Sequence, residues 1–238
     1  MEQAQIPTEN RRLYVIGDIH GRLDLLDRMI AAIERDVAEK GPDCLIVTVG
    51  DYIDRGPKSR HVLDRLLQNP FPGDYIALKG NHEALLQEFL EDPAVGAHWQ
   101  HLGGLQTLQS FGVHVSQLMG GRNFEQAAQE LRAALTPGHA GFLASLKMSL
   151  TAGRYFLCHA GVRPGVPLER QSVEDLLWIR EEFLDSTEDF GKIVVHGHTP
   201  TVEPQVKPNR INIDTGAFAT GKLTCVVLED DTHRFIVA

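Results

Sequence analysis

The stretch LYVIGDIHG, residues 13–21, decides how the rest of the chain is interpreted. Its apolar first half is typical of a short buried strand, and the Gly and Asp that follow end this strand in a loop. Apolar residues then recur at helical spacing from Leu26 to Val37, and Gly41-Pro42 ends the helix. A strand, a polar loop and a helix in this order form the repeating unit of an α/β fold.

The same unit recurs twice along the next part of the chain. CLIVTVG (44–50) predicts a second strand rich in β-branched residues, and an amphipathic helix follows from Val62 to Leu67. YIALKG (75–80) predicts a third strand, followed by a helix from His82 to Leu90. We expect a parallel sheet, because parallel strands are covered on both faces and therefore read as apolar runs.

The pattern changes over residues 92–150, where helical stretches run from Phe124 to Leu135 and from Phe142 to Leu150 without a clear strand. Strand signals then return at 155–161, 193–199, 211–216, 223–229 and 233–237. We expect the last three to form an antiparallel run. The organisation predicted is a polar tail at 1–11 and a single domain over 12–238, with a helical insertion at about 92–150.

The composition excludes several classes of protein. The 238 residues are 42% hydrophobic, which excludes intrinsic disorder, and no apolar run approaches the ~20 residues of a membrane span. The 23 Lys and Arg against 32 Asp and Glu give a net charge of −9, which argues against binding to nucleic acid or to an anionic membrane. Three cysteines without a CxxC pair, and no charged-then-apolar leader, predict a cytoplasmic protein.

Polar clusters directly follow the predicted strands. These clusters are GDIHG, GDYIDRG, GNHE, HAG and HGHT. Ligands of α/β sheets bind outside the carboxyl ends of the strands, so we expect these loops to converge on one site. Taken singly, each cluster also fits ordinary loop chemistry, since Asp, Asn and Gly favour turns and helix caps. The joint pattern, repeated at successive strand ends, favours a functional site.

The clusters contain a set of metal-ligand side chains. The candidate ligands are Asp18, His20, Asp51, Asn81, His159 and His198. Asp18 and His20 lie two residues apart, so an extended segment presents both to one cation. A mixed oxygen and nitrogen set without thiolate suits Mn, with Fe or Zn as alternatives. The set is too large for one tetrahedral ion and predicts two divalent ions that share a carboxylate and activate a water.

Other residues in the same loops suit phosphate chemistry. Arg55 in DYIDRG is a candidate phosphate ligand, because its guanidinium matches two phosphate oxygens, and the alternative is a surface salt bridge. Asp54 is expected to pair with His82, so that the carboxylate orients the imidazole as a general acid. The alternative for His82 is a solvent-facing residue in the first helical turn.

Arg180 is a second candidate phosphate ligand. Ser172 and Asp175 fit a capping box, and the apolar residues that follow form one face of a predicted helix. Arg180 falls near the middle of that face, where an unpaired charge is costly. The alternatives are a buried salt bridge and a substrate-binding role, and we favour the second. His196 is interpreted as structural or supporting, and Asp214 either orients a ligand or shapes a turn.

The five clusters resemble the signature of PPP-type metallophosphoesterases, which include the Ser/Thr protein phosphatases. The resemblance extends from about Leu13 to about Leu228. LLWIREEFL (176–184) and NIDTG (212–216) are similar to the small bacterial and phage branch, the lambda-type phosphatases. Pro200 stands where the wider superfamily often has the last His of GHxH, as expected for the PPP branch.

The resemblance implies a calcineurin-like fold, with two β-sheets packed face to face and helices outside. It implies that one metal is held by Asp18, His20 and Asp51, and the other by Asp51, Asn81, His159 and His198. It also implies that His82 acts with Asp54 as the acid, and that Arg55 and Arg180 bind phosphate.

The leading functional hypothesis is a phosphomonoesterase that hydrolyses phosphoserine and phosphothreonine in proteins by in-line attack of a metal-bound hydroxide. The alternatives are a symmetrical dinucleoside tetraphosphate hydrolase and a hydrolase of small phosphoesters. The GDYIDRG cluster favours the first, because the tetraphosphatase branch usually departs from its DxxDRG core. A catalytically silent binding scaffold is a further alternative, and the complete ligand set argues against it.

Overall fold

The computed structural model describes residues 4–6, 11–116, 123–229 and 231–238. In its central strands, alternate residues belong to two different hydrophobic cores. In the strand β2 (Arg12–Ile16), Leu13 and Val15 belong to a buried cluster between two sheets. Tyr14 and Ile16 belong to a second cluster beneath the helix α1 (Leu23–Lys40). Successive side chains of a strand point to opposite faces, so an uninterrupted apolar run is what a doubly covered strand requires.

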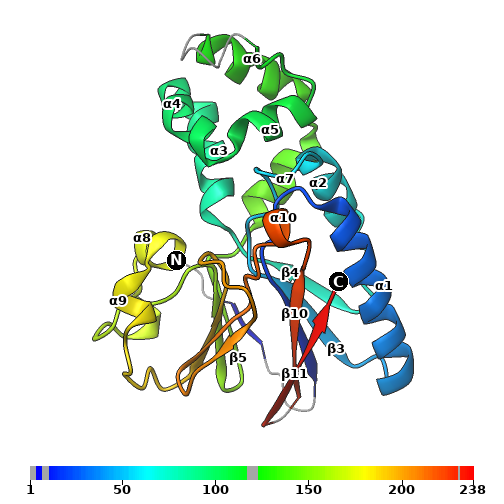
Figure 1. Ribbon diagram of the computed structural model, residues 1–238, viewed down its shortest axis with the longest axis vertical. Coiled ribbons are helices and arrows are strands. Elements are labelled where there is room, and N and C mark those ends of the chain that lie inside the picture. The colour runs from blue at the N-terminus through cyan, green and yellow to red at the C-terminus, as the bar shows by residue number, and fades with distance from the viewer. Residues whose placement is uncertain (1–3, 7–10, 117–122, 230) are drawn as a thin grey trace.

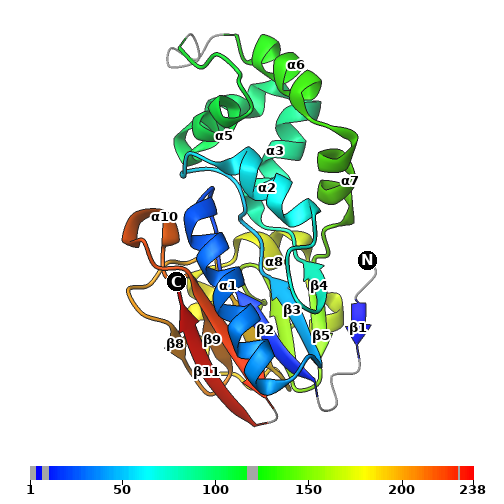
Figure 2. The same cartoon turned by 90° about the vertical axis from the view of Figure 1, so that its right-hand side faces the viewer.

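The first sheet has five strands in the order β11-β10-β2-β3-β4. Besides β2, these are β3 (Cys44–Thr48), β4 (Asp74–Ala77), β10 (Thr224–Glu229) and β11 (Thr232–Val237). β2, β3 and β4 are parallel, whereas β10 is antiparallel to both β2 and β11. Helix α1 lies across the outer face of this sheet, with α2 (Ser59–Leu67) beyond its upper end (Figure 2).

The second sheet has six strands in the order β1-β5-β6-β7-β9-β8. Its strands are β1 (Ala4–Ile6), β5 (Ser149–Ala152), β6 (Tyr155–Cys158), β7 (Ile193–His196), β8 (Gln205–Val206) and β9 (Arg210–Asn212). Leu157 and Val195 face the first sheet, while Phe156 and Val194 pack outward. The helices on that outer side are α8 (Val173–Trp178) and α9 (Glu181–Leu184), beside the short 3-10 turn η4 (Leu168–Arg170) (Figure 1).

A helical segment projects beyond one end of the two sheets (Figures 1 and 2). It contains α3 (Asn81–Glu91), η1 (Pro93–Val95), α4 (Gly96–Trp99), η2 (Gln100–Leu102), α5 (Gly104–Ser110), α6 (Phe124–Ala134) and α7 (Pro137–Ser145). Its buried residues, among them Phe89, Trp99 and Leu131, belong to the same cluster that lies beneath α1. The last helix, α10 (Ala217–Thr220), lies between β9 and β10.

The α/β class with two sheets packed face to face is confirmed, but three local predictions are wrong. Within the tail expected at 1–11, Ala4–Ile6 forms β1 and pairs in parallel with β5, while 1–3 and 7–10 lie outside the described residues. The helix expected from Phe142 to Leu150 ends at Ser145, because Ser149 already begins β5.

The third wrong prediction concerns the strands near the C-terminus. β10 and β11 are antiparallel neighbours as expected, but β9 lies in the other sheet, parallel to β7. Proximity in sequence favours pairing with β10, yet β9 pairs with β7 and its Ile211 is buried in the core between the sheets. Within the described residues, no helix is long and apolar enough to span a bilayer.

Candidate metal and phosphate site

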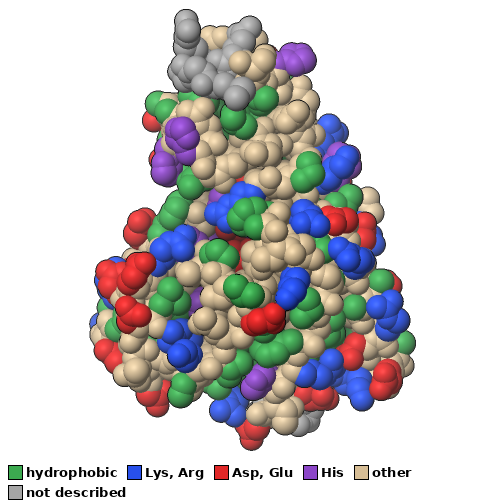
Figure 3. Space-filling view, in the orientation of Figure 1, with side chains coloured by type: hydrophobic (Ala, Val, Ile, Leu, Met, Phe, Trp, Pro, Cys, Tyr) green, Lys and Arg blue, Asp and Glu red, His purple; other side chains and the backbone are tan. Residues whose placement is uncertain are grey.

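The loops after β2, β3, β4, β6 and β7 meet where the helical segment joins the sheets. β2, β3 and β4 are parallel within one sheet, and β6 and β7 are parallel within the other, so their carboxyl ends lie together. All the candidate metal ligands are at most 4% exposed: Asp18, His20, Asp51, Asn81, His159 and His198. Basic, acidic and histidine side chains are visible together at this junction in the space-filling view (Figure 3).

Asp51 lies at the centre of the histidines. Its Oδ2 is 3.4 Å from His20 Nε2, and its Oδ1 is 3.4 Å from His159 Nε2. Burial alone would raise the pKa of Asp51, but the surrounding histidines outweigh burial and hold the pKa below its ordinary value. The two oxygens of this carboxylate therefore face two different groups of ligands.

Asn81 and Asp18 are the two remaining candidate ligands. Asn81 Oδ1 lies 2.8 Å from His159 Nε2 and 3.0 Å from His198 Nδ1. Asp18 Oδ2 accepts a hydrogen bond of 2.9 Å from the backbone N–H of His198. Burial and the neighbouring carboxylates of Asp214 and Asp51 raise the pKa of Asp18 well above its ordinary value. A cation at this position would relieve that repulsion.

The imidazoles are held in a form that leaves a ring nitrogen available to a metal. His20 Nδ1 lies 2.8 Å from the carbonyl oxygen of Ile53, and His159 Nδ1 lies 3.0 Å from that of Val49. A carbonyl oxygen only accepts, so each Nδ1 donates in these hydrogen bonds, and the buried Nε2 of His20, which has no hydrogen-bond partner, keeps its lone pair. Burial lowers the pKa of His20 to about 3, which keeps this imidazole neutral.

The residues present fit two cations. Two groups have ligand atoms within 4.8 Å of one another: His20, Asp51 and His82, and Asp51, His159 and His198. Asp18 Oδ1, His20 Nε2 and His198 Nε2 are buried and have no hydrogen-bond partner. Unpaired buried polar atoms are costly, and two bound metal ions would satisfy these three atoms. Asp51 belongs to both groups, as a shared carboxylate requires.

His82 and Asp54 form a closely paired dyad. His82 Nδ1 is 2.6 Å from Asp54 Oδ2, and both side chains are buried. On the other side of the ring, Arg55 Nη2 lies 3.2 Å from His82 Nε2. The Arg55 guanidinium also lies over the ring of Phe218, 4.7 Å from its centroid. The structure thus brings the predicted acid pair and the first predicted phosphate ligand together beside Asp51.

Arg180 reaches the site from a different position than the sequence pattern predicts. The expected continuous helix is broken into α8 and α9, and Arg180 lies at the break with φ −132 and ψ −101. Its Nη1 donates a 3.1 Å hydrogen bond to Thr199 Oγ1, next to His198. After burial, its charge is among the causes that lower the pKa of His159. No carboxylate in the described part of the chain pairs with Arg180, which argues against the salt-bridge alternative.

The site is built on backbone that most residues avoid. Left-handed φ values occur at His20 (46°), Asp51 (54°), Asp54 (70°), Arg55 (64°) and His198 (66°). Such conformations cost free energy in non-glycine residues and concentrate at functional sites. These positive φ values turn the side chains in directions that a loop with ordinary negative φ values would not allow.

Glu83 supports this strained backbone, and the sequence analysis assigned it no role. Its carboxylate accepts hydrogen bonds from the N–H groups of Asp51 (2.9 Å), Tyr52 (2.8 Å) and Gly80 (3.0 Å). Its position three residues after Gly80 has the spacing of a capping box, a signal that the sequence contains.

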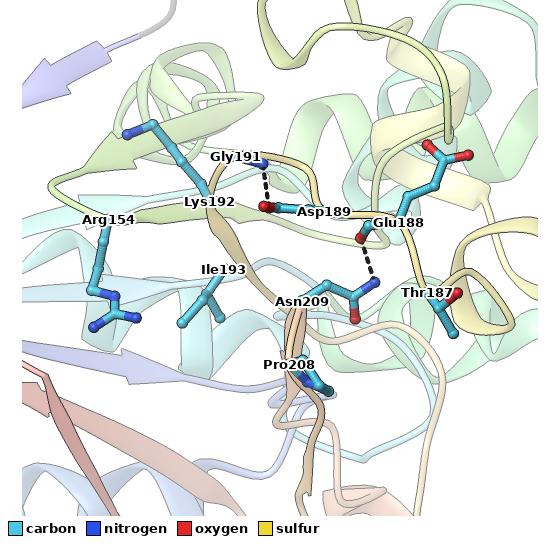
Figure 4. Close-up of a pocket in the computed structure, with 9 residues that line it drawn as sticks. All are labelled: Arg154, Thr187, Glu188, Asp189, Gly191, Lys192, Ile193, Pro208 and Asn209. Atoms are coloured by element: carbon cyan, nitrogen blue, oxygen red, sulfur yellow. Dashed lines mark hydrogen bonds between the residues drawn. The ribbon is translucent and has the colours of Figure 1, made fainter.

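The remaining candidates lie outside the ligand groups. His196 is buried against Phe183, with ring centroids 5.0 Å apart, and its Nδ1 faces the carbonyl oxygen of Gly197. Asp214 Oδ1 accepts from the backbone N–H of Gly216 at 2.8 Å, which shapes the turn after β9. A separate pocket of about 450 Å³ lies near the amino ends of β6 and β7 (Figure 4). Arg154, Lys192 and Asn209 are among its lining residues, and no predicted site residue is.

Comparison with known proteins agrees with this geometry. The model of the family "Calcineurin-like phosphoesterase" matches residues 11–226. The chain is 28% identical to the asymmetrical bis(5'-nucleosyl)-tetraphosphatase PrpE of Anoxybacillus flavithermus, over 89% of this chain and 88% of that protein. It is 26% identical to the serine/threonine-protein phosphatase 2 of Salmonella typhimurium, over 90% of this chain and 91% of that protein. Among solved structures, a putative diadenosine tetraphosphatase superposes with a TM-score of 0.67 at 20% identity, covering 99% of this chain and 97% of that one.

Proposed function

The chain belongs to the calcineurin-like phosphoesterase family, and we propose that it hydrolyses phosphoserine and phosphothreonine monoesters in proteins. The observation that carries the proposal is the dyad of His82 Nδ1 and Asp54 Oδ2, 2.6 Å apart beside the ligand groups. A serine or threonine alkoxide is a poor leaving group and needs a proton as the bond breaks. A nucleotide phosphate leaves as a stable anion and has little need of such an acid.

The family uses a dinuclear metal site, and here Asp18, His20 and Asp51 would hold one ion. Asp51, Asn81, His159 and His198 would hold the other. We favour Mn, because the donors are carboxylate, amide and imidazole without thiolate. When bound, two such cations supply Lewis-acid stabilisation of phosphoryl oxygens and lower the pKa of a coordinated water.

Arg55 and Arg180 are proposed to bind the phosphoryl group. The two guanidiniums come from different elements, and neither is paired with a carboxylate in the part of the chain that the structure describes. Each guanidinium therefore keeps N–H donors for phosphate oxygens, which it matches in a bidentate way. Arg55 now donates to His82 Nε2, and turning this guanidinium to phosphate would release that nitrogen.

His82 is proposed to protonate the leaving oxygen from Nε2. A water oxygen forms a new P–O bond while the bond from phosphorus to the leaving oxygen breaks. The electron pair of the broken bond stays on the leaving oxygen, which takes the Nε2 proton. Asp54 accepts from Nδ1–H and stabilises the imidazolium form that precedes the transfer. General acid catalysis of this kind is worth roughly 10²–10⁴-fold in rate.

A second candidate is hydrolysis of dinucleoside tetraphosphates. It is favoured by the 28% identity to a protein named as an asymmetrical tetraphosphatase, whereas the sequence motifs suggested the symmetrical activity as the alternative. Hydrolysis of phosphoproteins and hydrolysis of dinucleoside tetraphosphates would both use the metal ligands proposed above. The two reactions differ in the leaving group.

One assay compares the two candidates. Purified protein supplied with Mn²⁺ is incubated with phosphoserine and phosphothreonine peptides, with p-nitrophenyl phosphate and with diadenosine tetraphosphate. We expect the highest kcat/KM on the phosphopeptides or on p-nitrophenyl phosphate. A kcat/KM on diadenosine tetraphosphate that exceeds both by tenfold or more would favour the second candidate and contradict the first.

A cytoplasmic location is part of the proposal. Cys44, Cys158 and Cys225 are all buried and unpaired, which suits a reducing compartment. Protease protection and fractionation of cells that produce the protein test this point.

A further inference from the structure

Two side chains of the helical segment donate hydrogen bonds to the carboxylate of Asp54. Trp99, at the end of α4, donates from Nε1 to Oδ2 at 2.6 Å. Thr107, in α5, donates from Oγ1 to Oδ1 at 2.5 Å. Trp99, Thr107 and Asp54 are 1%, 0% and 0% exposed, so water does not compete for these contacts.

Together with His82, these donors occupy both oxygens of Asp54. Oδ2 accepts from His82 Nδ1 and Trp99 Nε1, and Oδ1 accepts from Thr107. Because the oxygens of a carboxylate accept hydrogen bonds, three donors placed around the two oxygens fix the rotation of this side chain. The position of His82 Nδ1–H, and thus the direction of Nε2, depends on that rotation.

From this arrangement we propose that Trp99 and Thr107 are positioning residues for the proton-donating dyad. Both donate to Asp54, which is paired with His82, so they act on His82 through Asp54. The proposal rests on the acid role of His82 given above. It assigns the helical segment a part in the chemical step, where the sequence indicated only an insertion.

The backbone of the same segment approaches the dyad as well. The N–H of Arg55 donates to the carbonyl oxygen of Gly103 at 3.3 Å. Gly103 has φ +104, and a Cβ there would lie 2.4 Å from Arg55 N, so only glycine allows this approach. Thr107 Oγ1 also accepts from the N–H of Asp54 at 2.9 Å. The segment 99–107 therefore contacts both the backbone and the side chain of Asp54.

Two conservative variants remove one donor each. Trp99→Phe removes the N–H and keeps a large ring, and Thr107→Val removes the hydroxyl at nearly constant volume. Thr224→Val is the matched control, because its buried hydroxyl bonds to Thr215 and lies outside the dyad. The substrates are glycerol 2-phosphate, whose alkoxide needs a proton, and p-nitrophenyl phosphate, whose leaving group does not.

We expect kcat on glycerol 2-phosphate to fall roughly 10- to 100-fold in each variant, because small misplacements of a catalytic group have effects of this size. The rate on p-nitrophenyl phosphate should fall less than about threefold. The control should match the wild type on both. In a His82→Asn background, Trp99→Phe and Thr107→Val should cause no further loss. Equal losses on both substrates, or a loss that persists without His82, would overturn the proposal.

A measurement that does not depend on catalysis separates the positioning role of Trp99 and Thr107 from the proposed phosphatase function. The Nδ1–H proton of His82 is followed by NMR of ¹⁵N-histidine-labelled protein, with His82→Asn for assignment. Trp99→Phe and Thr107→Val should each shift this resonance, whereas Thr224→Val should not. An unchanged resonance in both variants overturns the positioning role. Failure of the wild type to hydrolyse any phosphoester would instead refute the proposed function.

Discussion

Asp51 is the residue that both groups of candidate ligands share. Asp51→Asn keeps the size of the side chain but removes its charge and one accepting oxygen. We expect the bound metal to fall well below two ions per chain and hydrolysis to be abolished, because no other carboxylate in the described clusters faces both groups. Metal content by mass spectrometry after desalting is the measurement. A variant with full metal content and full activity would show that the ions are not bridged here.

His82 lies within one ligand group and is nevertheless assigned the acid role, because its Nδ1 is committed to Asp54. We expect His82→Asn to lower kcat on an alkyl phosphate by roughly 10²–10⁴-fold, with a smaller loss on p-nitrophenyl phosphate. Metal content should stay near that of the wild type. Loss of an ion in this variant would identify His82 as a ligand instead.

Arg180 is half-buried, and its Nη1 donates a hydrogen bond to the hydroxyl of Thr199. We expect Arg180→Ala to weaken kcat/KM and inhibition by inorganic phosphate together, by roughly 10- to 150-fold. Thermal stability should change little, because the variant leaves no buried carboxylate without a partner. Arg180→Lys should show an intermediate defect, since lysine keeps the positive charge but loses the bidentate geometry of the guanidinium. Reduced stability with unchanged phosphate inhibition would contradict the binding role.

Among the helices and strands, the sequence predicts those whose position depends on the local pattern of apolar and polar residues. The apolar runs that end in Gly and Asp correctly locate β2 and β3, and the strand-loop-helix order correctly gives their parallel pairing. Pairing partners distant in sequence are not predictable in this way, which is why β9 was placed in the wrong sheet. The helix predicted from Phe142 to Leu150 runs into the first two residues of β5, because periodicity does not separate a short buried strand from a helical segment.

The break between α8 and α9 shows a further limit. The apolar spacing fits one helix, but Ile179 is extended and buried, and the chain restarts at Glu181. The sequence pattern predicts Arg180 on the apolar face of one helix, and this is wrong, because Arg180 lies at the break between α8 and α9. Similarly, nothing in the spacing of Trp99 and Thr107 indicates that they contact Asp54, 45 and 53 residues away.

Asp36 joins α1 to the first sheet, and it yields a prediction about stability. Its carboxylate accepts from the Tyr14 hydroxyl on β2 and from Arg234 on β11. Burial would raise the pKa of Asp36, but these hydrogen bonds outweigh burial and lower it. We expect Asp36→Asn to reduce the free energy of unfolding by about 1–2 kcal/mol at neutral pH, allowing for the partial exposure of Arg234.

The sign of this effect with pH follows from the lowered pKa. The stabilisation is fully present above the pKa of the unfolded carboxyl, about 4, and is lost as the pH falls through the lower folded value. Urea unfolding of wild type and variant between pH 7 and pH 3 should show the two curves approaching each other in acid. A difference that stays constant over this range would contradict the assignment.

At the scale of the whole molecule, the site requires both sheets. The first sheet carries Asp18, His20, Asp51 and Asn81 on the loops after β2, β3 and β4, and the second carries His159 and His198 after β6 and β7. Since Asp51 faces His159 across the junction, two bound cations would join the sheets at this end. The five clusters allowed this convergence to be predicted, because the carboxyl ends of parallel strands lie together.

We propose that this chain is a phosphomonoesterase whose activity requires two bound metal ions. Metal-free protein is titrated with Mn²⁺, and phosphate release from a phosphothreonine peptide is followed at each addition, with bound metal measured in parallel. We expect no hydrolysis without metal and a rate that reaches its plateau at two bound ions per chain. Full activity of the metal-free protein, or a plateau at a single bound ion, would contradict it.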